Sequence, residues 1–208
     1  MNDYLQSPEF EALKSHRPDV KIEKELSEDL LNIKGSTIHI AKTVMNLVTN
    51  AIESISGRGS VTISTENRYV DIPAHGYEDM REGEYVALTV SDTGRGIPAK
   101  DLGKIFEPFY TKKVMGRSGT GLGLAVVWGT VKDHHGYIDI RSEEDRGSTF
   151  TLYFPVTRER ASTIEKPLSM EAYTGQGETV LVVDDVKEQR ELAVSMLGRL
   201  GYQVEAVA

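Results

Sequence analysis

The feature that most constrains the fold of this chain is a set of four segments in which apolar and polar residues alternate with a period of two. These segments are SVTIST, EYVALTV, YIDIRS and STFTLYF, at residues 60–65, 84–90, 137–142 and 148–154. Such alternation is typical of strands that bury one face. Weaker alternation in KIEKEL (21–26) and LLNIKG (30–35) predicts two short strands before them. Helical patterns lie between the strands, so the sequence predicts an α+β fold in which helices cover one layer of largely antiparallel sheet.

The first helical pattern covers residues 37–55, with Ser36 or Thr37 as its N-cap and Gly57 as its stop. Its apolar positions recur at spacings of three and four, and they are Ile40, Val44, Leu47, Val48, Ala51 and Ile55. The opposite stripe carries polar side chains, namely Thr43, Asn46, Asn50 and Glu53. The pattern predicts an amphipathic helix with its polar stripe away from the core.

The composition changes after Pro155. Residues 158–177 are polar, contain Pro and Gly, and show no periodicity, which predicts a linker. The chain is therefore expected to consist of a domain at 1–157, this linker, and a further element at 178–208.

The further element begins with an apolar strand that ends at Asp184 and Asp185. A helix to about Leu200 follows, and Gly201 closes it before a second strand. A β-α-β unit of about 30 residues cannot bury a core of its own. We expect it to be disordered, to pack on the first domain, or to pair with another copy, since its VLVV strand otherwise exposes an edge.

Charge and composition exclude several classes of function. The net charge of -8 and the pI near 5.2 argue against a nucleic-acid-binding face. There is no cysteine, so no disulfide or thiolate metal site can form. No apolar run approaches the roughly 20 residues of a membrane-spanning helix, and the N-terminal residues lack the features of a signal peptide. We therefore expect a cytoplasmic chain with no nucleic-acid partner and no membrane contact.

Asn46 and Asn50 are spaced to lie on one helix face and to reach a single ligand. An amide oxygen is a hard, neutral ligand that suits Mg²⁺ already bound to phosphates. The alternative for these residues, and for Glu53 on the same stripe, is a solvated helix face.

The stretch SDTGRGIP, at 91–98, follows an expected strand whose alternation places Asp92 on the core face. A buried carboxylate needs a donor, and the exocyclic amine of adenine is a good one. Gly94 and Gly96 allow the backbone to approach a flat ring, and Ile97 offers apolar contact. The alternative is an ordinary Asp-Xaa-Gly turn after an edge strand.

The stretch IFEPFYTKK, at 105–113, places three aromatic residues and two lysines beside a glycine-rich segment. This arrangement suggests a lid that closes over a ligand, with Lys112 or Lys113 meeting phosphate as a point charge. An aromatic anchor for a surface loop is the alternative.

Gly119, Gly121 and Gly123 precede the second helical pattern, LAVVWGTV. Backbone amides in the first turn of a helix are free to bind an anion. The glycines do not follow the opening strand of a βαβ unit, which disfavours a dinucleotide fold, and no GK[ST] follows them, which excludes a P-loop. The remaining interpretation is a phosphate-binding site formed by backbone amides at the start of a helix.

Taken in order, NLVTNAIES, SDTGRGI, IFEPFYTKK and GTGLGLAVV resemble the four sequence boxes of the histidine-kinase catalytic and ATP-binding domain. The resemblance covers roughly residues 18–156 and implies the Bergerat-type (GHKL) two-layer α/β sandwich with ATP and Mg²⁺ as cofactors. Residues 178–208 resemble the truncated start of a response-regulator receiver domain, with Asp184 and Asp185 as its acidic pair. Together these suggest part of a hybrid sensor kinase.

By matching position, the resemblance makes Asn50 the Mg²⁺ ligand and Asn46 a support for the metal and phosphates. Asp92 would bind the adenine amine, with Gly94 and Gly96 shaping the pocket. Asn46 stands where related gyrase-type ATPases carry a water-activating Glu, which favours transfer to a protein nucleophile over hydrolysis.

The same resemblance assigns the phosphates to Lys112 or Lys113 and to the amides of the second glycine box, whose residues are Gly119, Thr120, Gly121, Leu122, Gly123 and Leu124. It places Thr149 near Asp92. Asn46, Asn50 and Lys112 would carry the catalytic role.

One departure from the family concerns the phosphoacceptor. Neither of the usual His motifs of the helical hairpin occurs, and the histidines present, His16, His39, His75, His134 and His135, lie in other contexts. For His134 and His135 a structural role at a helix C-terminus is favoured over phosphate acceptance.

The expected partners are therefore ATP, a dimerisation hairpin of the parent kinase and a receiver domain, with this chain a monomer. Two alternatives remain open. One is a nucleotide-sensing module without transferase activity, and the other is a self-sufficient ATPase.

Overall fold

The computed structural model describes residues 2–7, 10, 17–71, 74–75, 79–111, 120–159 and 174–208. The chain divides into two compact units, Met1–Glu159 and Arg160–Ala208, which are described separately below. Within the described ranges no helix combines the length and the hydropathy that crossing a bilayer requires.

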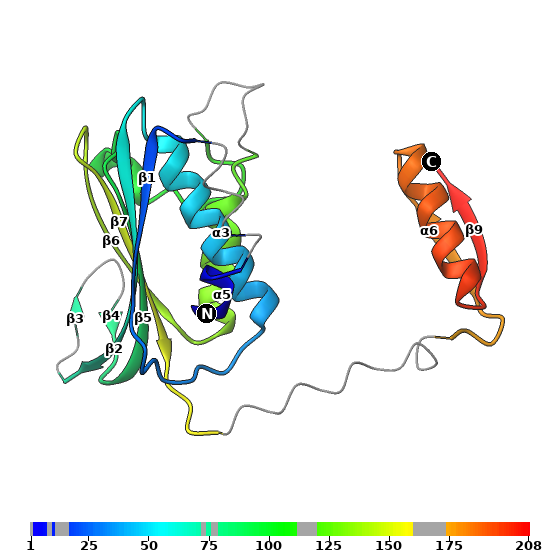
Figure 1. The fold of residues 1–208 in the computed structure, drawn as a ribbon, viewed down its shortest axis with the longest axis horizontal. Helices are drawn as coiled ribbons and strands as arrows, with labels where there is room; N and C mark the ends of the chain where they lie inside the picture. Colours follow the sequence, from blue (N-terminus) through cyan, green and yellow to red (C-terminus); the bar gives the residue numbers. More distant parts are fainter. Residues whose placement is uncertain are drawn as a thin grey trace. The chain divides into compact units, whose positions relative to one another are not determined.

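A twisted sheet in the order β1-β2-β5-β7-β6 forms one layer of the first unit (Figure 1). Its strands are β1 (Val20–Leu26), β2 (Gly59–Val70), β5 (Gly83–Asp92), β6 (Tyr137–Glu143) and β7 (Gly147–Pro155). β1 runs parallel to β2, and the other neighbours are antiparallel. The four strands with strong alternation are thus confirmed, and so is the weaker strand expected at 21–26.

The second layer consists of helices on one face of this sheet (Figure 1). The helices of the unit are α1 (Asn2–Leu5), α3 (Thr37–Ser54), α4 (Ala99–Leu102) and α5 (Gly123–Asp133). A small pair of strands, β3 (Ala74–His75) and β4 (Asp79–Met80), lies on the opposite side of the sheet (Figure 1). The expected sandwich of one sheet covered by helices is confirmed.

The core lies between the two layers because the alternating strands turn their apolar residues toward α3 and α5. Val61 and Ile63 of β2 are fully buried, and so is Leu88 of β5. The apolar stripe of α3 lies in the same core cluster, where Val44 and Val48 are fully buried. The sequence pattern therefore gives both the orientation of α3 and the inward face of the sheet.

The N-cap of α3 is Ser36, as expected, and its hydroxyl accepts a hydrogen bond from the amide of His39 at 3.4 Å. One member of the expected polar stripe behaves differently. Thr43 is fully buried, and its hydroxyl has no hydrogen-bond partner among the described residues. The stripe is not solvated along its length because α5 packs against α3.

The expected strand at 30–35 is wrong. Only Ile33 pairs, in an isolated bridge to Val156. The backbone groups on either side are satisfied in other ways, since Leu31 N donates to the Asn67 side chain at 2.9 Å and Asn32 O accepts from Thr157 N at 2.8 Å. A segment whose amides bond to a side chain cannot continue a ladder.

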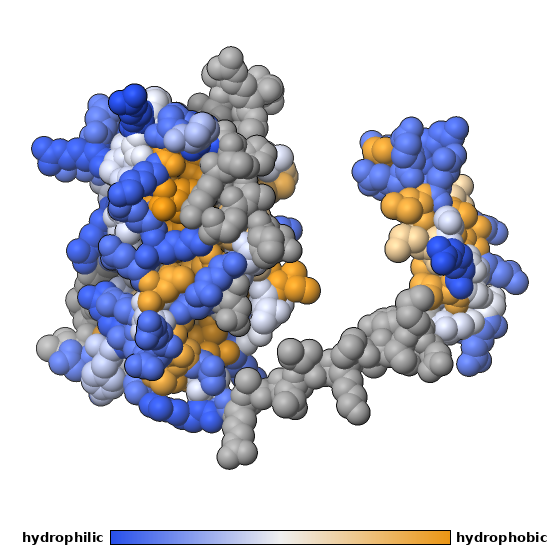
Figure 2. Space-filling view, viewed as in Figure 1, coloured by the Kyte–Doolittle hydropathy of each residue, from blue (hydrophilic) through white to orange (hydrophobic). Residues whose placement is uncertain are grey.

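The second unit contains the expected order of strand, helix and strand. Its elements are β8 (Thr179–Val183), α6 (Lys187–Arg199) and β9 (Gln203–Val207), and the two strands pair in parallel. No described residue of this unit, from 174 to 208, is buried. Large apolar side chains lie at its surface (Figure 2), among them Leu181, Val183, Leu192 and Met196.

The N-terminal segment contributes to the core of the first unit. Leu5 and Phe10 have no exposed surface, and the Phe10 ring packs edge-on against Tyr4 with centroids 6.1 Å apart. Lys24 joins them, because its Nζ donates to Leu5 O at 2.6 Å and lies 4.9 Å from the centre of the Phe10 ring.

Replacing this buried ring should destabilise the whole unit. We expect Phe10→Ala to lower the free energy of unfolding by about 3 kcal/mol, because a large cavity would remain where the ring was. Urea unfolding followed by circular dichroism measures it. The matched control is Phe109→Ala, since Phe109 is 73% exposed and should change stability by less than about 0.5 kcal/mol. Equal effects of the two variants would contradict burial of Phe10.

Candidate functional site

A cavity of about 630 Å³ opens between α3, the start of α5 and the loop that follows β5. This volume is in the range of small-molecule sites in proteins. Its walls combine apolar side chains such as Val90, Ile97 and Ile105 with the polar residues Asn46, Asn50 and Asp92. The cavity therefore offers both a surface for a flat apolar group and polar groups to orient it.

Asp92 is the last residue of β5 and is only 7% exposed. Its Oδ1 accepts hydrogen bonds from the amide of Gly94 at 2.8 Å and from the hydroxyl of Ser54 at 2.8 Å. Gly94 makes this arrangement possible, because a Cβ at that position would lie 1.9 Å from Ser54 Oγ and 2.7 Å from Asp92 Oδ1. Any side chain at position 94 would displace one of these groups.

Burial raises the pKa of Asp92 above its ordinary value of 3.8, although hydrogen bonds from Ser54, Gly94 and Ser148 oppose this effect. The hydroxyl of Ser54 is shared between Asp92 and a second acceptor. It also lies 2.7 Å from Ala51 O, so one proton serves two acceptors. A carboxylate has about four acceptor sites, so with bonds from Ser54, Gly94 and Ser148 the Asp92 carboxylate retains capacity for a donor from a ligand.

Asn46 and Asn50 both line the cavity from α3, as their spacing predicts. Asn46 Nδ2 donates to Gly123 O at 3.2 Å, which orients the amide and leaves its Oδ1 as an acceptor. Among the described residues no group of three or more His, Cys, Asp or Glu side chains is arranged to hold a metal. The side-chain oxygens of Asn46 and Asn50, together with ligand phosphates, form a donor set that fits Mg²⁺.

Helix α5 starts at the cavity without a side-chain cap. Its N-cap is Leu122, which makes no side-chain capping bond, and Gly123 and Leu124 at its start line the cavity. Amides in the first turn of a helix have no partner within the helix, and they carry partial positive charge. The start of α5 is therefore suited to an anionic group, as the glycine cluster predicts.

The two ends of the loop between Phe109 and Gly121 meet in the structure. Phe109 N donates to Gly121 O at 3.0 Å. Gly121 has a φ of 69°, and a Cβ there would lie 2.5 to 2.8 Å from the Phe109 backbone. Glycine is required at 121 because both the backbone conformation and the close approach exclude a side chain.

Most of the site residues expected from the sequence meet at this cavity. Those that line it are Asn46, Asn50, Asp92, Gly96, Ile97, Thr120, Gly121, Gly123 and Leu124. Gly94 lies beside Asp92, and Leu122 is 37% exposed just outside the lining. Lys112, Lys113 and Gly119 lie outside the described residues.

The structure does not bring Thr149 to the cavity. Asp92 pairs with Ser148 in the β5–β7 ladder, and Ser148 lines the cavity. Side chains alternate across a strand, so Thr149 faces the other side of the sheet, where its hydroxyl lies 2.8 Å from Ser91 Oγ. Ser148 therefore takes the place that we expected for Thr149.

Sequence reasoning also missed several residues of the cavity wall. Ser54 is four positions after Asn50, so helical spacing offered a signal for it. Tyr110 and Asp101 form a pair in the wall, with Tyr110 Oη donating to Asp101 Oδ1 at 2.9 Å. The turn between β6 and β7 contributes Glu144 and Asp145, and no local pattern indicates them.

His134 has a structural role at the end of α5. His134 Nδ1 lies 2.6 Å from Thr130 O and His134 Nε2 lies 3.2 Å from Ser36 N. The first bond needs a donor and the second an acceptor, which assigns the neutral Nδ1–H tautomer. His135 has a φ of 53° in the turn after α5. His16 lies outside the described residues.

A family model for histidine kinase-, DNA gyrase B- and HSP90-like ATPases matches residues 35–158, which carry α3, α5 and the cavity. The chain belongs to this family, and its first unit is an ATP-binding catalytic domain of the histidine-kinase class. No described feature of the cavity conflicts with that class.

Particular relatives are sensor kinases. Sensor kinase CckA of Brucella abortus is 35% identical over 198 residues, which cover 91% of this chain and 21% of that protein. Sensor histidine kinase ZraS of Escherichia coli is 33% identical over 138 residues, 66% of this chain and 26% of that protein. The chain thus spans about a fifth to a quarter of these relatives.

A solved structure agrees with these relatives. The catalytic domain of histidine kinase ThkA superposes with a TM-score of 0.59 at 27% identity, covering 76% of this chain and 93% of that one.

The raised pKa of Asp92 predicts a specific effect of pH on stability. Since the folded state holds its proton to higher pH than the unfolded state does, stability falls as pH rises from about 3.8 to the folded pKa. Asp92→Asn should remove this loss of stability at higher pH, because asparagine does not ionise. We expect the melting temperature of the variant to exceed that of the wild type at pH 7.5, and the difference to shrink as the pH is lowered through the folded pKa toward 3.8. Calorimetry across this range measures it, and a less stable variant at pH 7.5 would contradict the assignment.

Proposed function

We propose that this chain is the catalytic part of a sensor histidine kinase and positions Mg·ATP for transfer of the γ-phosphoryl group to a histidine on a dimerisation hairpin. The observation that carries the proposal is the convergence on one cavity of the buried Asp92 carboxylate, the two asparagines of α3 and the uncapped start of α5. The relatives supply the class of reaction, because those described above are named as sensor kinases.

Adenine would lie at the Asp92 end of the cavity. The Asp92 carboxylate would accept a hydrogen bond from the exocyclic amine, an interaction that guanine cannot offer at the same position. Ile97, Ile105 and Phe150 supply apolar contacts for the ring. Asp92 lines the cavity together with these residues, so a ligand in the cavity would reach the carboxylate.

The phosphates would lie between α3 and the start of α5. The amides of the first turn of α5 would face the anion, and Asn50 with Asn46 would hold Mg²⁺ against the phosphate oxygens. Lys112 or Lys113 would add positive charge. This local arrangement is needed because the chain as a whole has a net charge of -8, which repels a free nucleotide at long range.

The chemistry needs little covalent participation by the domain. An imidazole nitrogen of the hairpin would attack the γ-phosphorus in line, the bond from that phosphorus to the bridging oxygen would break, ADP would leave, and the phosphorylated imidazole would lose the proton on its other nitrogen to solvent. Bound Mg²⁺ would neutralise charge on the phosphates, and the cavity would supply position and orientation. Asn46, where related ATPases carry a glutamate, has no carboxylate to activate water.

The second unit is proposed to be the start of a receiver domain, which would make the parent a hybrid kinase. Asp184 and Asp185 follow β8, where a receiver carries its acidic pair, and Asp184 Oδ1 accepts from Val186 N at 2.8 Å. The first unit holds 159 of the 208 residues, so the match to CckA over 91% of the chain extends into this second unit.

Nucleotide binding tests the first part of the proposal. Titration calorimetry with Mg·ATP should give a Kd of tens to hundreds of micromolar, about 5 to 6.5 kcal/mol. Asp92→Ala and Asn50→Ala should abolish binding, because one loses the adenine acceptor and the other the metal ligand. Thr149→Ala is the control that should bind like the wild type, since Thr149 faces away from the cavity. Absence of binding by the wild type would overturn the proposal.

Phosphoryl transfer tests the second part. A separately produced hairpin from the parent protein, mixed with this chain and radiolabelled ATP, should become labelled on its histidine, whereas the chain alone should stay unlabelled. The label should be stable to base and lost in acid, as expected of a phosphoramidate. Binding of ATP without any transfer would favour a nucleotide-sensing module instead. Turnover of several ATP per minute by the chain alone would favour an ATPase.

A further inference from the structure

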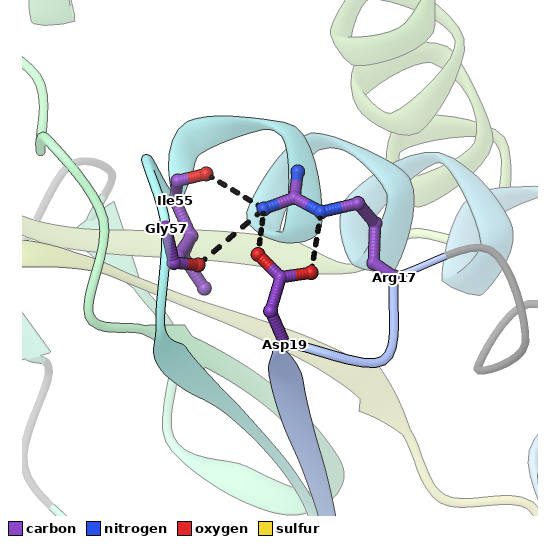
Figure 3. A network of polar contacts seen from close by, with 4 residues as sticks. All are labelled: Arg17, Asp19, Ile55 and Gly57. Atoms are coloured by element: carbon purple, nitrogen blue, oxygen red, sulfur yellow. Dashed lines mark hydrogen bonds and ion pairs between the residues drawn. The ribbon is translucent and has the colours of Figure 1, made fainter.

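Arg17 lies where the chain enters the first sheet, and it holds the far end of helix α3 (Figure 3). Its Nε donates to Asp19 Oδ1 and its Nη2 to Asp19 Oδ2, each at 3.0 Å. The same Nη2 reaches Ile55 O at 3.2 Å and, less closely, Gly57 O at 3.5 Å. The guanidinium thus joins a carboxylate of the segment before β1 to the backbone that follows α3.

The C-terminus of α3 needs such a partner. The last carbonyl groups of a helix lack partners within it and carry partial negative charge. The last turn of α3 contains no basic residue, and the helix ends at Ser54 with Ile55 as its C-cap. Arg17, 38 residues away in sequence, supplies the missing positive charge and donor. Its bidentate bond to Asp19 fixes the plane of the guanidinium that makes these contacts.

The residues that Arg17 contacts follow Ser54 in the chain, and Ser54 lines the adenine end of the cavity. Ser54, next to Ile55 in the chain, donates to Asp92 Oδ1 at 2.8 Å. Its carbonyl accepts from Arg95 N at 3.2 Å, and Arg95 also lines the cavity. The backbone of α3 at this turn is therefore held by Arg17 on one side and supports Asp92 and the first glycine loop, residues 93–98 after β5, on the other.

We propose that Arg17 is a positioning residue of the nucleotide site: it fixes the C-terminal turn of α3 so that Ser54 and the Ser54 carbonyl hold Asp92 and the first glycine loop in the geometry that binds adenine. This inference rests on the proposed function, because it assumes that the cavity binds an adenine nucleotide. It adds a residue outside the cavity, in the segment that precedes β1.

Arg17→Ala tests it, with Arg158→Ala as the matched control. Arg158 also joins distant parts of the chain through two contacts to one carboxylate, that of Glu84 at the other end of β5. The Arg17 side chain is 33% exposed and that of Arg158 is 69% exposed, so Arg17→Ala should lower the melting temperature more than Arg158→Ala, and the comparison that tests positioning is one of affinity. We expect Arg17→Ala to weaken Mg·ADP binding about fivefold, and Arg158→Ala to change it less than about twofold.

The dissociation constants are measured well below the melting temperature of every variant, so that loss of stability alone cannot change them. A cycle with Ser54→Ala separates positioning from a general effect: if Arg17 acts through Ser54, the double variant should bind about as weakly as the weaker single variant. Asp19→Asn is the milder variant should Arg17→Ala not fold, and it should weaken binding in the same direction.

Unchanged affinity of Arg17→Ala would overturn the positioning role, and additive effects of Arg17→Ala and Ser54→Ala would overturn its action through the Ser54 hydroxyl. If the wild type does not bind Mg·ADP, the proposed function and this inference both fail. If the wild type binds Mg·ADP and Arg17→Ala binds it equally well, only this inference fails.

Discussion

The packing of α3 on the sheet is the constraint on which the site depends. Its buried stripe, which includes Val44, Leu47 and Val48, fixes the rotation of the helix about its axis, and each such apolar side chain contributes about 1.5 to 3 kcal/mol on burial. Because the rotation is fixed, the neighbouring stripe that carries Asn46, Asn50 and Ser54 has to face the cavity. The residues that stabilise the fold and those that bind the ligand therefore share one helix, on adjacent faces.

Asp92 shows that this arrangement has an energetic cost. An apolar or amide side chain at the end of β5 would be easier to bury, and the direction of the Asp92 pKa indicates that the folded protein disfavours the carboxylate. The cost is tolerable because Ser54 and Gly94 offset part of it. Stability and ligand recognition thus oppose one another at a single residue, as is common at binding sites.

Local patterns in the sequence were sufficient where the structure depends on local periodicity. Alternation located the four strong strands and the inward position of Asp92, and helical spacing placed Asn46 and Asn50 together. Local patterns did not predict features that depend on pairing between residues far apart in the sequence. The ladder register puts Ser148, and not Thr149, beside Asp92. Residues 30–35 do not form the expected strand, because backbone groups of this segment bond to Asn67 and Thr157 instead. No pattern near Arg17 indicates that its partner is the end of a helix 38 residues further on.

The two helical walls of the cavity are joined at two separate points. Asn46 bonds to Gly123 at the start of α5, and His134 at its end accepts from Ser36 before α3. Both bonds join residues of the protein alone, so the spacing of the walls does not depend on a ligand. Binding therefore does not spend free energy on bringing α3 and α5 together. The site is preorganised on this side.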